Sequence, residues 1–324
     1  MDSQKRKDLL KDWLSKKLKI DFLFSPASSD ASFRRYFRVK AQDNSFIIMD
    51  APPQNESIES FLKIAKLLSI VGVNVPEIYE VDKSLGFILM KDFGDKTYLD
   101  VLNNDNQTAL YTDAINSLIR MQKNIKRGLC QSYSKKILID EMGLFIEWYL
   151  KKYKSYDLNK KEHEELLSWF EEISIKVFSQ EKFFVHRDFH SRNLMIFESK
   201  NPGILDFQDA LEGPITYDLV SLLKDAYIEW DEEIILDHAV RYWEKAKTSQ
   251  LINNYEFPDF YKDFECMGIQ RHLKVLGIFA RLSIRDKKNQ YLENIPLVEK
   301  YLMNATERYS DFHQLRNFLD KVIK

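Results

Sequence analysis

Residues 186–195 read HRDFHSRNLM, and a short apolar run, Phe183–Val185, stands directly before them. An apolar run bounded by polar residues predicts a buried strand that leads into a loop. Within this loop Asp188 stands five positions before Asn193. A single loop can therefore hold a carboxylate and an amide close together. This pair is the main evidence for the predicted fold.

A second acid follows a second apolar run farther along the chain. The run Gly203–Leu205 predicts another short strand, and Asp206 stands at its end. The order of these features matches the catalytic loop and the metal-binding acid of kinases. Phosphoryl transfer needs an acceptor hydroxyl held in line and metal ions that neutralise charge on the phosphate oxygens. Asp188 is thus the candidate catalytic residue. Asn193 and Asp206 are candidate ligands of Mg²⁺, which prefers oxygen atoms.

Each of these residues has a plainer interpretation by itself. Asp188 could cap a helix, and His186 or His190 could be satisfied histidines of the core. Two spaced acids, an amide and two apolar strands in this order favour the catalytic interpretation over the plainer ones.

The pattern of apolar residues divides the chain into a mixed part and a helical part. Before residue 93, spacing and composition predict helices over 5–18 and 56–71, strands over 33–39, 46–49, 77–81 and 86–90, and a turn over Ser25–Ser32. Beyond Thr97 the helical period dominates, and one expected helix covers 297–319.

We therefore predict an α+β, bilobal, protein-kinase-like fold. Its small N-terminal sheet lobe covers residues 1–93 and its larger, mostly helical C-terminal lobe covers residues 94–324. The candidate hinge between the lobes is Lys91–Gly94, which reads KDFG.

Composition limits the class of protein. The chain has 324 residues, of which 44% are apolar, and a formal net charge of -2. Lys and Arg are not in clustered excess, so no nucleic-acid partner is expected. Cys130 and Cys266 lie outside any CxxC pattern, which favours a reducing compartment. Neither a signal peptide nor a run of about 18 apolar residues is visible, so the sequence predicts a cytoplasmic protein without a membrane partner.

Residues 205–219, LDFQDALEGPITYDL, extend the catalytic-loop pattern. Together with residues 186–195 they resemble the aminoglycoside-phosphotransferase and choline-kinase superfamily, whose catalytic loop often carries a second histidine as His190 does here. The chain resembles still more the anomeric amino-sugar kinases of cell-wall recycling, the N-acetylmuramate/N-acetylglucosamine kinases. The segments that carry this closer resemblance are 29–38, 49–53, 206–223, 270–277 and 281–287.

The resemblance implies an ATP- and Mg²⁺-dependent kinase of a small-molecule substrate, namely an amino sugar. Asp188 would serve as base or orienting group for the sugar C1 hydroxyl, and the product would be a sugar 1-phosphate of peptidoglycan recycling. The N-terminal lobe would bind the nucleotide, and the C-terminal lobe would bind the acceptor. Asp218, which follows the Gly-Pro turn, would brace the catalytic loop.

The nucleotide-binding lobe departs from the usual kinase pattern. The glycine-rich loop is replaced by SSDAS at residues 28–32, whose Ser29 and Ser32 could still contact phosphate through amides and hydroxyls. Met90, just before the hinge, is a further candidate contact for the nucleotide.

A second departure concerns the phosphate-contacting cation. The strand at 46–50 lacks the usual lysine. We expect Arg34 or Arg35 to supply this charge, with Glu59 as a candidate partner. The alternative is that both arginines are solvated residues of an edge strand.

Candidates for the acceptor pocket lie on a predicted helix near the C-terminus. Gln270, Lys274 and Arg281 share one stripe of this helix with Gly277. The stripe could be a solvated face, or it could line the pocket, where a cation would meet the lactyl carboxylate of N-acetylmuramate. Gly277 indicates that another element approaches closely.

Two acids complete the set of candidates. Glu147, beside two aromatic residues, and Asp209, just after Asp206, could contact sugar hydroxyls. Alternatively, the segment of Glu147 belongs to the core and Asp209 caps a turn.

Two rival functions stay open at this point. An aminoglycoside, choline or another alcohol could replace the amino sugar as acceptor on the same fold. The chain could also be a non-catalytic nucleotide-binding scaffold, because the usual lysine and glycines are missing.

Overall fold

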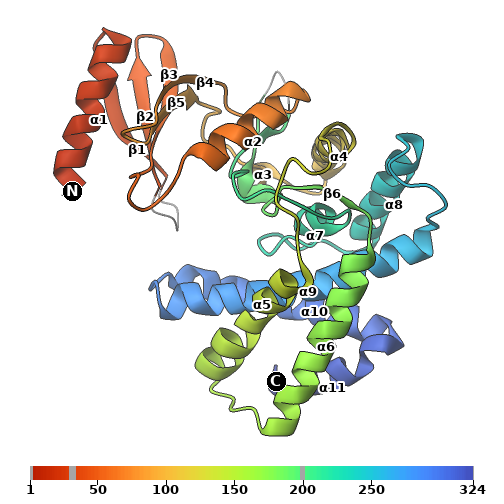
Figure 1. Cartoon of the computed structure of the whole chain (residues 1–324). Coiled ribbons are helices and arrows are strands. Elements are labelled where there is room, and N and C mark those ends of the chain that lie inside the picture. Colours follow the sequence, from red (N-terminus) through yellow and green to blue (C-terminus); the bar gives the residue numbers. More distant parts are fainter. Residues whose placement is uncertain (1–2, 29–33, 198–200, 324) are drawn as a thin grey trace. The chain divides into compact units, whose positions relative to one another are not determined.

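The computed structural model describes residues 3–28, 34–197 and 201–323. Serines 29 and 32 lie outside these residues. The chain divides into two compact units (Figure 1). The first comprises Met1–Lys96 and Met195–Gln208, and the second comprises Thr97–Leu194 and Asp209–Lys324. The prediction of a small sheet region followed by a mostly helical remainder is confirmed. The division falls at residue 96 and adds 195–208 to the first unit, whereas the hinge predicted from sequence is at 91–94.

The first unit is built on an antiparallel five-stranded sheet. Its strands follow the order β1-β2-β3-β5-β4. Their bounds are β1 Leu23–Ser28, β2 Arg35–Ala41, β3 Asn44–Asp50, β4 Ile78–Asp82 and β5 Phe87–Lys91, with helix α2 at Glu59–Ile70.

Strand β1 corrects one prediction. The sequence predicts a turn over Ser25–Ser32, but Ser25, Pro26 and Ser28 pair with β2. Proline lacks a donor and is tolerated in a strand at the edge of a sheet. Because β1 is an edge strand, Pro26 fits there in spite of its turn-like chemistry.

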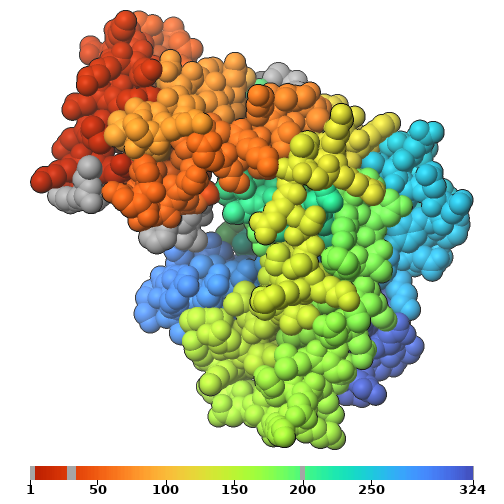
Figure 2. All heavy atoms as spheres, viewed as in Figure 1, coloured from red at the N-terminus to blue at the C-terminus, as the bar shows by residue number. Residues whose placement is uncertain are grey.

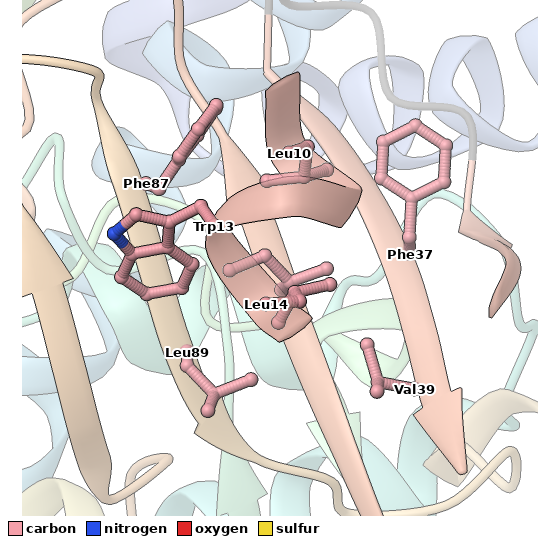
Figure 3. Close-up of a cluster of buried hydrophobic side chains, with 8 residues drawn as sticks. Leu10, Trp13, Leu14, Phe37, Val39, Phe87 and Leu89 are labelled. Carbon is pink, nitrogen blue, oxygen red and sulfur yellow. The ribbon is translucent and has the colours of Figure 1, made fainter. Parts of the chain in front are cut away.

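Helix α1, Ser3–Leu18, closes one face of the sheet. Its Leu10, Trp13 and Leu14 pack on side chains of β2, β3 and β5 in one apolar cluster (Figure 3). Burial of such side chains is the main source of stability here. The helix is also tied by charge, because Arg6 Nε donates to Oδ1 of the buried Asp50 over 2.7 Å.

The second unit consists mainly of helices. Their bounds are α3 Tyr98–Val101, α4 Gln107–Asn124, α5 Lys135–Leu144, α6 Lys160–Ser179, α7 Tyr217–Leu223, α8 Glu232–Thr248, α9 Phe257–Ile284, α10 Ile295–Arg308 and α11 His313–Val322. Side chains of α6 and α8 form part of the surface of this unit on the face drawn in Figure 2. Among the described residues, none of the helices combines the length and apolar character that a membrane crossing requires.

Short strands flank the loop that contains Asp188 and precede the segment that contains Asp206. Strand β6, Lys182–Val185, pairs antiparallel with β9, Leu211–Pro214, and β7, Leu194–Met195, forms a two-stranded sheet with β8, Gly203–Ile204. The remaining elements are the π-helix η1 at Phe145–Tyr153 and the 3₁₀ turns η2 Ser191–Asn193, η3 Asn289–Asn294 and η4 Ser310–Phe312.

The prediction of one helix over 297–319 is wrong. Tyr309 leaves the helical conformation with φ -121 and ψ 124, so that α10 ends at Arg308 and α11 begins at His313. Asp311 in the intervening turn forms ion pairs with Lys176 at 2.6 Å and Lys262 at 2.9 Å. These contacts with other helices are not visible in the local spacing of apolar residues.

Helix α9 is almost entirely buried within the second unit. The close approach expected at Gly277 is confirmed, because a Cβ placed there would lie 2.3 Å from the carbonyl carbon of Leu144 and 2.5 Å from its oxygen. Backbone atoms cannot move aside as a flexible side chain can. Glycine at position 277 therefore allows α9 to lie this close to α5.

Replacing Gly277 by alanine is therefore expected to lower the free energy of unfolding by about 1–3 kcal/mol through overpacking. Gly268→Ala is the matched control on the same helix, since its Cβ would meet nothing nearer than 3.7 Å. That variant should be neutral or slightly stabilising, because alanine is the better helix former. Urea unfolding of both variants measures the difference, and equal stabilities would contradict the close contact.

Candidate active site

A buried acid of α7 accepts hydrogen bonds from the backbone of the loop after β6. Asp218 accepts hydrogen bonds from the backbone N–H of His186 at 2.7 Å and of Arg187 at 3.0 Å. Arg187 has φ 79, a left-handed conformation that few side chains adopt outside special sites. Burial raises the pKa of Asp218 to about 7, against the effect of the two N–H groups. The expectation that Asp218 braces this loop is confirmed.

A second buried acid, Asp225, braces the far end of the same loop. It accepts from the backbone N–H of Ser191 at 2.9 Å and of Tyr227 at 3.0 Å. Asp225 was not among the residues predicted from sequence. Its position just beyond α7, one helix length after Asp218, is the only signal that could have indicated it.

Asp188 and Asn193 are joined within the loop. The Asn193 Nδ2 donates to the backbone oxygen of Asp188 over 2.9 Å, and the Asn193 N–H donates to the His190 oxygen over 2.9 Å. These bonds fix the amide plane with its nitrogen toward Asp188. The carboxylate of Asp188 accepts no hydrogen bond from any of the described residues. The loop therefore holds its backbone firmly and leaves this carboxylate to a ligand.

The electrostatic surroundings keep Asp188 ionised. Burial by itself would raise the pKa of the Asp188 carboxyl, but nearby positive charge, that of Arg271 first, outweighs burial and holds the pKa below its ordinary value. Arg271 Nη1 also donates to the Arg187 backbone oxygen over 3.0 Å. Burial lowers the pKa of His190 on the same loop, so this ring is neutral near pH 7.

Arg271 was missed by the sequence analysis, although it lies inside one of the segments that carry the family resemblance. It stands beside the polar stripe of α9 and not on it, and a charged residue on an apolar face cannot be assigned a partner from spacing alone.

Gln270 and Lys274 are buried, with 0% and 8% of their surface exposed, so their interpretation as a solvated face is wrong. Lys274 Nζ donates to Glu141 Oε1 at 2.9 Å, and Gln270 Nε2 donates to Glu141 Oε2 at 3.2 Å. Arg187 Nη2 reaches the same carboxylate at 2.6 Å. These residues form a polar network around Glu141 that adjoins Asp188 through Arg187.

The other acceptor candidates of the second unit lie outside this network. Glu147 is exposed on η1, with its carboxylate 3.5 Å from Lys152. Asp209 is exposed in a turn. Arg281 is partly buried, its Nε has no hydrogen-bond partner among the described residues, and burial lowers its pKa.

Asp206 belongs to the first unit, in the segment after β8. Its φ of 60 is left-handed, as is that of Arg187, so it is a second strained backbone position. Its Oδ1 accepts a hydrogen bond from Gln208 Nε2 at 2.7 Å. Strain of this kind is held in place where the surroundings require a particular side-chain direction.

The two candidate arginines of the first unit have different partners. Arg34 is buried and forms an ion pair with Glu56, so its interpretation as a solvated residue is wrong. Arg35 is partly exposed, and its Nη2 lies 2.5 Å from Oδ2 of Asp50, the carboxylate that also binds Arg6.

The expected pairing with Glu59 is wrong. Glu59 forms an exposed ion pair with Lys83 at 3.0 Å, and the acid that meets Arg34 precedes α2. Met90 is buried in β5 opposite Ile47 of β3.

The predicted hinge segment contains an ordered charge cluster. Asp92 accepts from Arg38 Nε at 2.6 Å, from Ser45 Oγ at 2.5 Å and from the Gly94 N–H at 2.9 Å. Burial would raise the pKa of Asp92, but these donors hold it below its ordinary value. The turn at 92–94 is therefore fixed to the sheet of the first unit.

The chain is similar to known phosphotransferases over most of its length. Residues 24–251 match the family model described as "Phosphotransferase enzyme family". The chain is 42% identical over 320 residues to the N-acetylmuramate/N-acetylglucosamine kinase of Neisseria meningitidis serogroup B, covering 97% of this chain and 95% of that protein. It is 44% identical over 297 residues to the kinase of the same name from Pseudomonas aeruginosa, covering 91% and 87%.

Solved structures share the fold at low identity. The ADP-bound aminoglycoside phosphotransferase APH(2'')-Ib has a TM-score of 0.58 at 16% identity, covering 92% of this chain and 97% of that one. An ethanolamine kinase of Plasmodium vivax has a TM-score of 0.61 at 13% identity, covering 97% and 96%. The match over most of the chain shows that the protein belongs to the phosphotransferase enzyme family.

Proposed function

We propose that this enzyme transfers the terminal phosphoryl group of ATP to the C1 hydroxyl of N-acetylmuramate or N-acetylglucosamine. The observation that carries the proposal is an ionised Asp188 held beside Asn193 in a loop that two buried acids brace. The names of the relatives that cover nearly the whole chain support the choice of acceptor. The reaction would be a cytoplasmic step in the recycling of cell-wall sugars.

Asp188 would orient the acceptor hydroxyl and take its proton as the new bond to phosphorus forms. An anomeric hydroxyl is more acidic than an ordinary alcohol, so positioning contributes more than basicity. The low pKa of Asp188 suits this role, since the carboxylate is ready to accept a hydrogen bond at neutral pH.

Asn193 and Asp206 would hold Mg²⁺, and their donor set fits this ion. Magnesium needs few protein ligands and prefers oxygen, and an amide with one carboxylate can suffice. The Asn193 nitrogen is engaged with the loop backbone, which directs the amide oxygen away from it. When bound, the ion neutralises charge on the phosphate oxygens of the nucleotide.

In the first unit, Arg34 is the candidate replacement for the usual lysine. It combines a buried guanidinium with an acidic partner, Glu56, as a phosphate-contacting cation requires. Ser29, Ser32, Arg35 and Met90 are proposed as further nucleotide contacts.

Arg34→Ala is expected to raise the Michaelis constant for ATP about 10-fold or more, because a charge-assisted contact is lost. Arg35→Ala should have a smaller effect, since Arg6 still holds Asp50. Lys83→Ala, which removes an exposed ion pair, is the control. If neither arginine variant alters the constant for ATP, this assignment is wrong.

Arg271→Met is expected to move the acid limb of the pH profile of kcat/KM. Loss of the positive charge raises the pKa of Asp188, and activity requires its ionised form, so the limb shifts to higher pH. Arg271→Lys keeps the charge and should keep the limb. An unmoved limb in Arg271→Met would show that Arg271 acts through its hydrogen bonds to the Arg187 oxygen and the Tyr217 hydroxyl and not through its charge.

Incubation with ATP, Mg²⁺ and a panel of acceptors tests the proposed function. ADP should form with the two amino sugars and not with their C1-blocked methyl glycosides. ADP formed only with an aminoglycoside or choline would assign the enzyme to the rival acceptor class. Nucleotide binding without ADP formation on any acceptor would favour the non-catalytic scaffold.

A further inference from the structure

Arg192 lies in the catalytic loop, directly before Asn193, and its guanidinium is held by aromatic rings. Its Cζ lies 3.7 Å from the ring centroid of Tyr227 and 5.7 Å from that of Tyr291. Phe279 of α9 joins the two tyrosines, with ring centroids 6.0 Å and 5.3 Å away from theirs. Among the described residues, no carboxylate forms an ion pair with Arg192.

The buried acid that braces the loop also holds the backbone of Tyr227, the ring nearest to Arg192. Asp225 accepts from the N–H of Ser191, next to Arg192, and from the N–H of Tyr227. The loop and the aromatic ring are thus positioned together before any ligand binds. A stacked guanidinium keeps its N–H donors in the plane of the group, where they match a carboxylate in a bidentate arrangement.

All groups that hold Arg192 belong to the second unit, as does Asp188. The cations proposed for the nucleotide, Arg34 and Arg35, belong to the first unit. N-acetylmuramate differs from N-acetylglucosamine by a lactyl group that bears a carboxylate and is attached at C3, two ring carbons from C1. Arg192 stands four positions after Asp188 in the same loop, so the residue proposed to meet C1 and this arginine are close in the chain.

We propose that Arg192 binds the carboxylate of an anionic acceptor, namely the lactyl group of N-acetylmuramate, and so sets the preference between the two sugars. This inference rests on the proposed function and adds to it the residue that selects the substrate. Two other cations are predicted from sequence. Lys274 fits the role less well, because it is already paired with Glu141 at 2.9 Å. Arg281 of α9 is the rival that substitution separates from Arg192.

The experiment compares kcat/KM for N-acetylmuramate, its carboxamide and N-acetylglucosamine in the unmodified enzyme, in Arg192→Gln and in Arg281→Gln. For the unmodified enzyme, the carboxamide should be poorer than the acid by about 10-fold or more, the range of a charge-assisted hydrogen bond. Arg192→Gln should lower the value for N-acetylmuramate about 10-fold or more beyond any loss for N-acetylglucosamine, and should no longer distinguish acid from carboxamide. Arg281→Gln should preserve the distinction.

Three results would overturn the inference. Equal losses for both sugars in Arg192→Gln would assign the residue to loop positioning. A change confined to the Michaelis constant for ATP would assign it to a nucleotide phosphate. Loss of discrimination in Arg281→Gln alone would transfer the role to that residue. The comparison of acid with carboxamide needs no variant, so poor folding of Arg192→Gln leaves the inference testable. Failure of the unmodified enzyme to phosphorylate either sugar would instead refute the proposed function itself.

Discussion

Replacing Asp188 by alanine is expected to lower turnover by at least about 100-fold, because removal of a positioned general base costs this much or more. Steady-state ADP release with a saturating amino sugar measures the loss. Nucleotide affinity should change little, since Asp188 is assigned to the acceptor. Asp237→Ala is the control, because Asp237 is an exposed acid whose carboxylate pairs, within the described part of the chain, with Arg241 of the same helix at 2.6 Å.

Turnover of Asp188→Ala within a few-fold of the unmodified enzyme would contradict the assignment of this residue. A large loss together with an equal loss of nucleotide affinity would point to collapse of the loop. Asp188→Asn, which preserves the shape of the side chain, separates these two causes.

Replacing Glu141 by glutamine is expected to destabilise the second unit by about 3–5 kcal/mol, because it leaves buried cations without their counter-charge. Glu141 accepts from both Arg187 and Lys274, and those charges hold its pKa below the ordinary value although burial would raise it. Chemical denaturation measures the change.

The adjacent residue provides a matched control for Glu141→Gln. Asp140 forms an exposed ion pair with Lys136, so Asp140→Asn should change stability by no more than about 0.5 kcal/mol. Combining Glu141→Gln with Lys274→Met should recover part of the loss, because one uncompensated cation is removed. A loss below about 1 kcal/mol in Glu141→Gln would show that water or another group compensates the two cations.

The sequence predicted the fold where local pattern and tertiary structure agree. The helix of residues 5–18 and the strand of 46–49 have clear apolar periods, and both are present as α1 and β3. The catalytic loop was predictable because Asp188 and Asn193 are joined by a short segment of chain. Their separation in sequence nearly determines their separation in space.

The residues that support the loop were less accessible to prediction. Asp225, Arg271 and Glu141 lie on other elements, and their approach depends on how helices pack in the second unit. Gln270 and Lys274 stand out in the sequence as polar residues on an apolar helix, but the open question of their exposure was decided by the burial of α9 among other helices. A polar stripe on an apolar helix usually faces solvent, and the hydrogen bonds of the Glu141 network help to make its burial tolerable.

The most direct measurement is phosphorus NMR of the product formed from N-acetylglucosamine, ATP and Mg²⁺. The proposal predicts a sugar phosphate whose phosphorus couples to the anomeric proton. A product phosphorylated at any other hydroxyl, or an intact sugar beside unspent ATP, would contradict it.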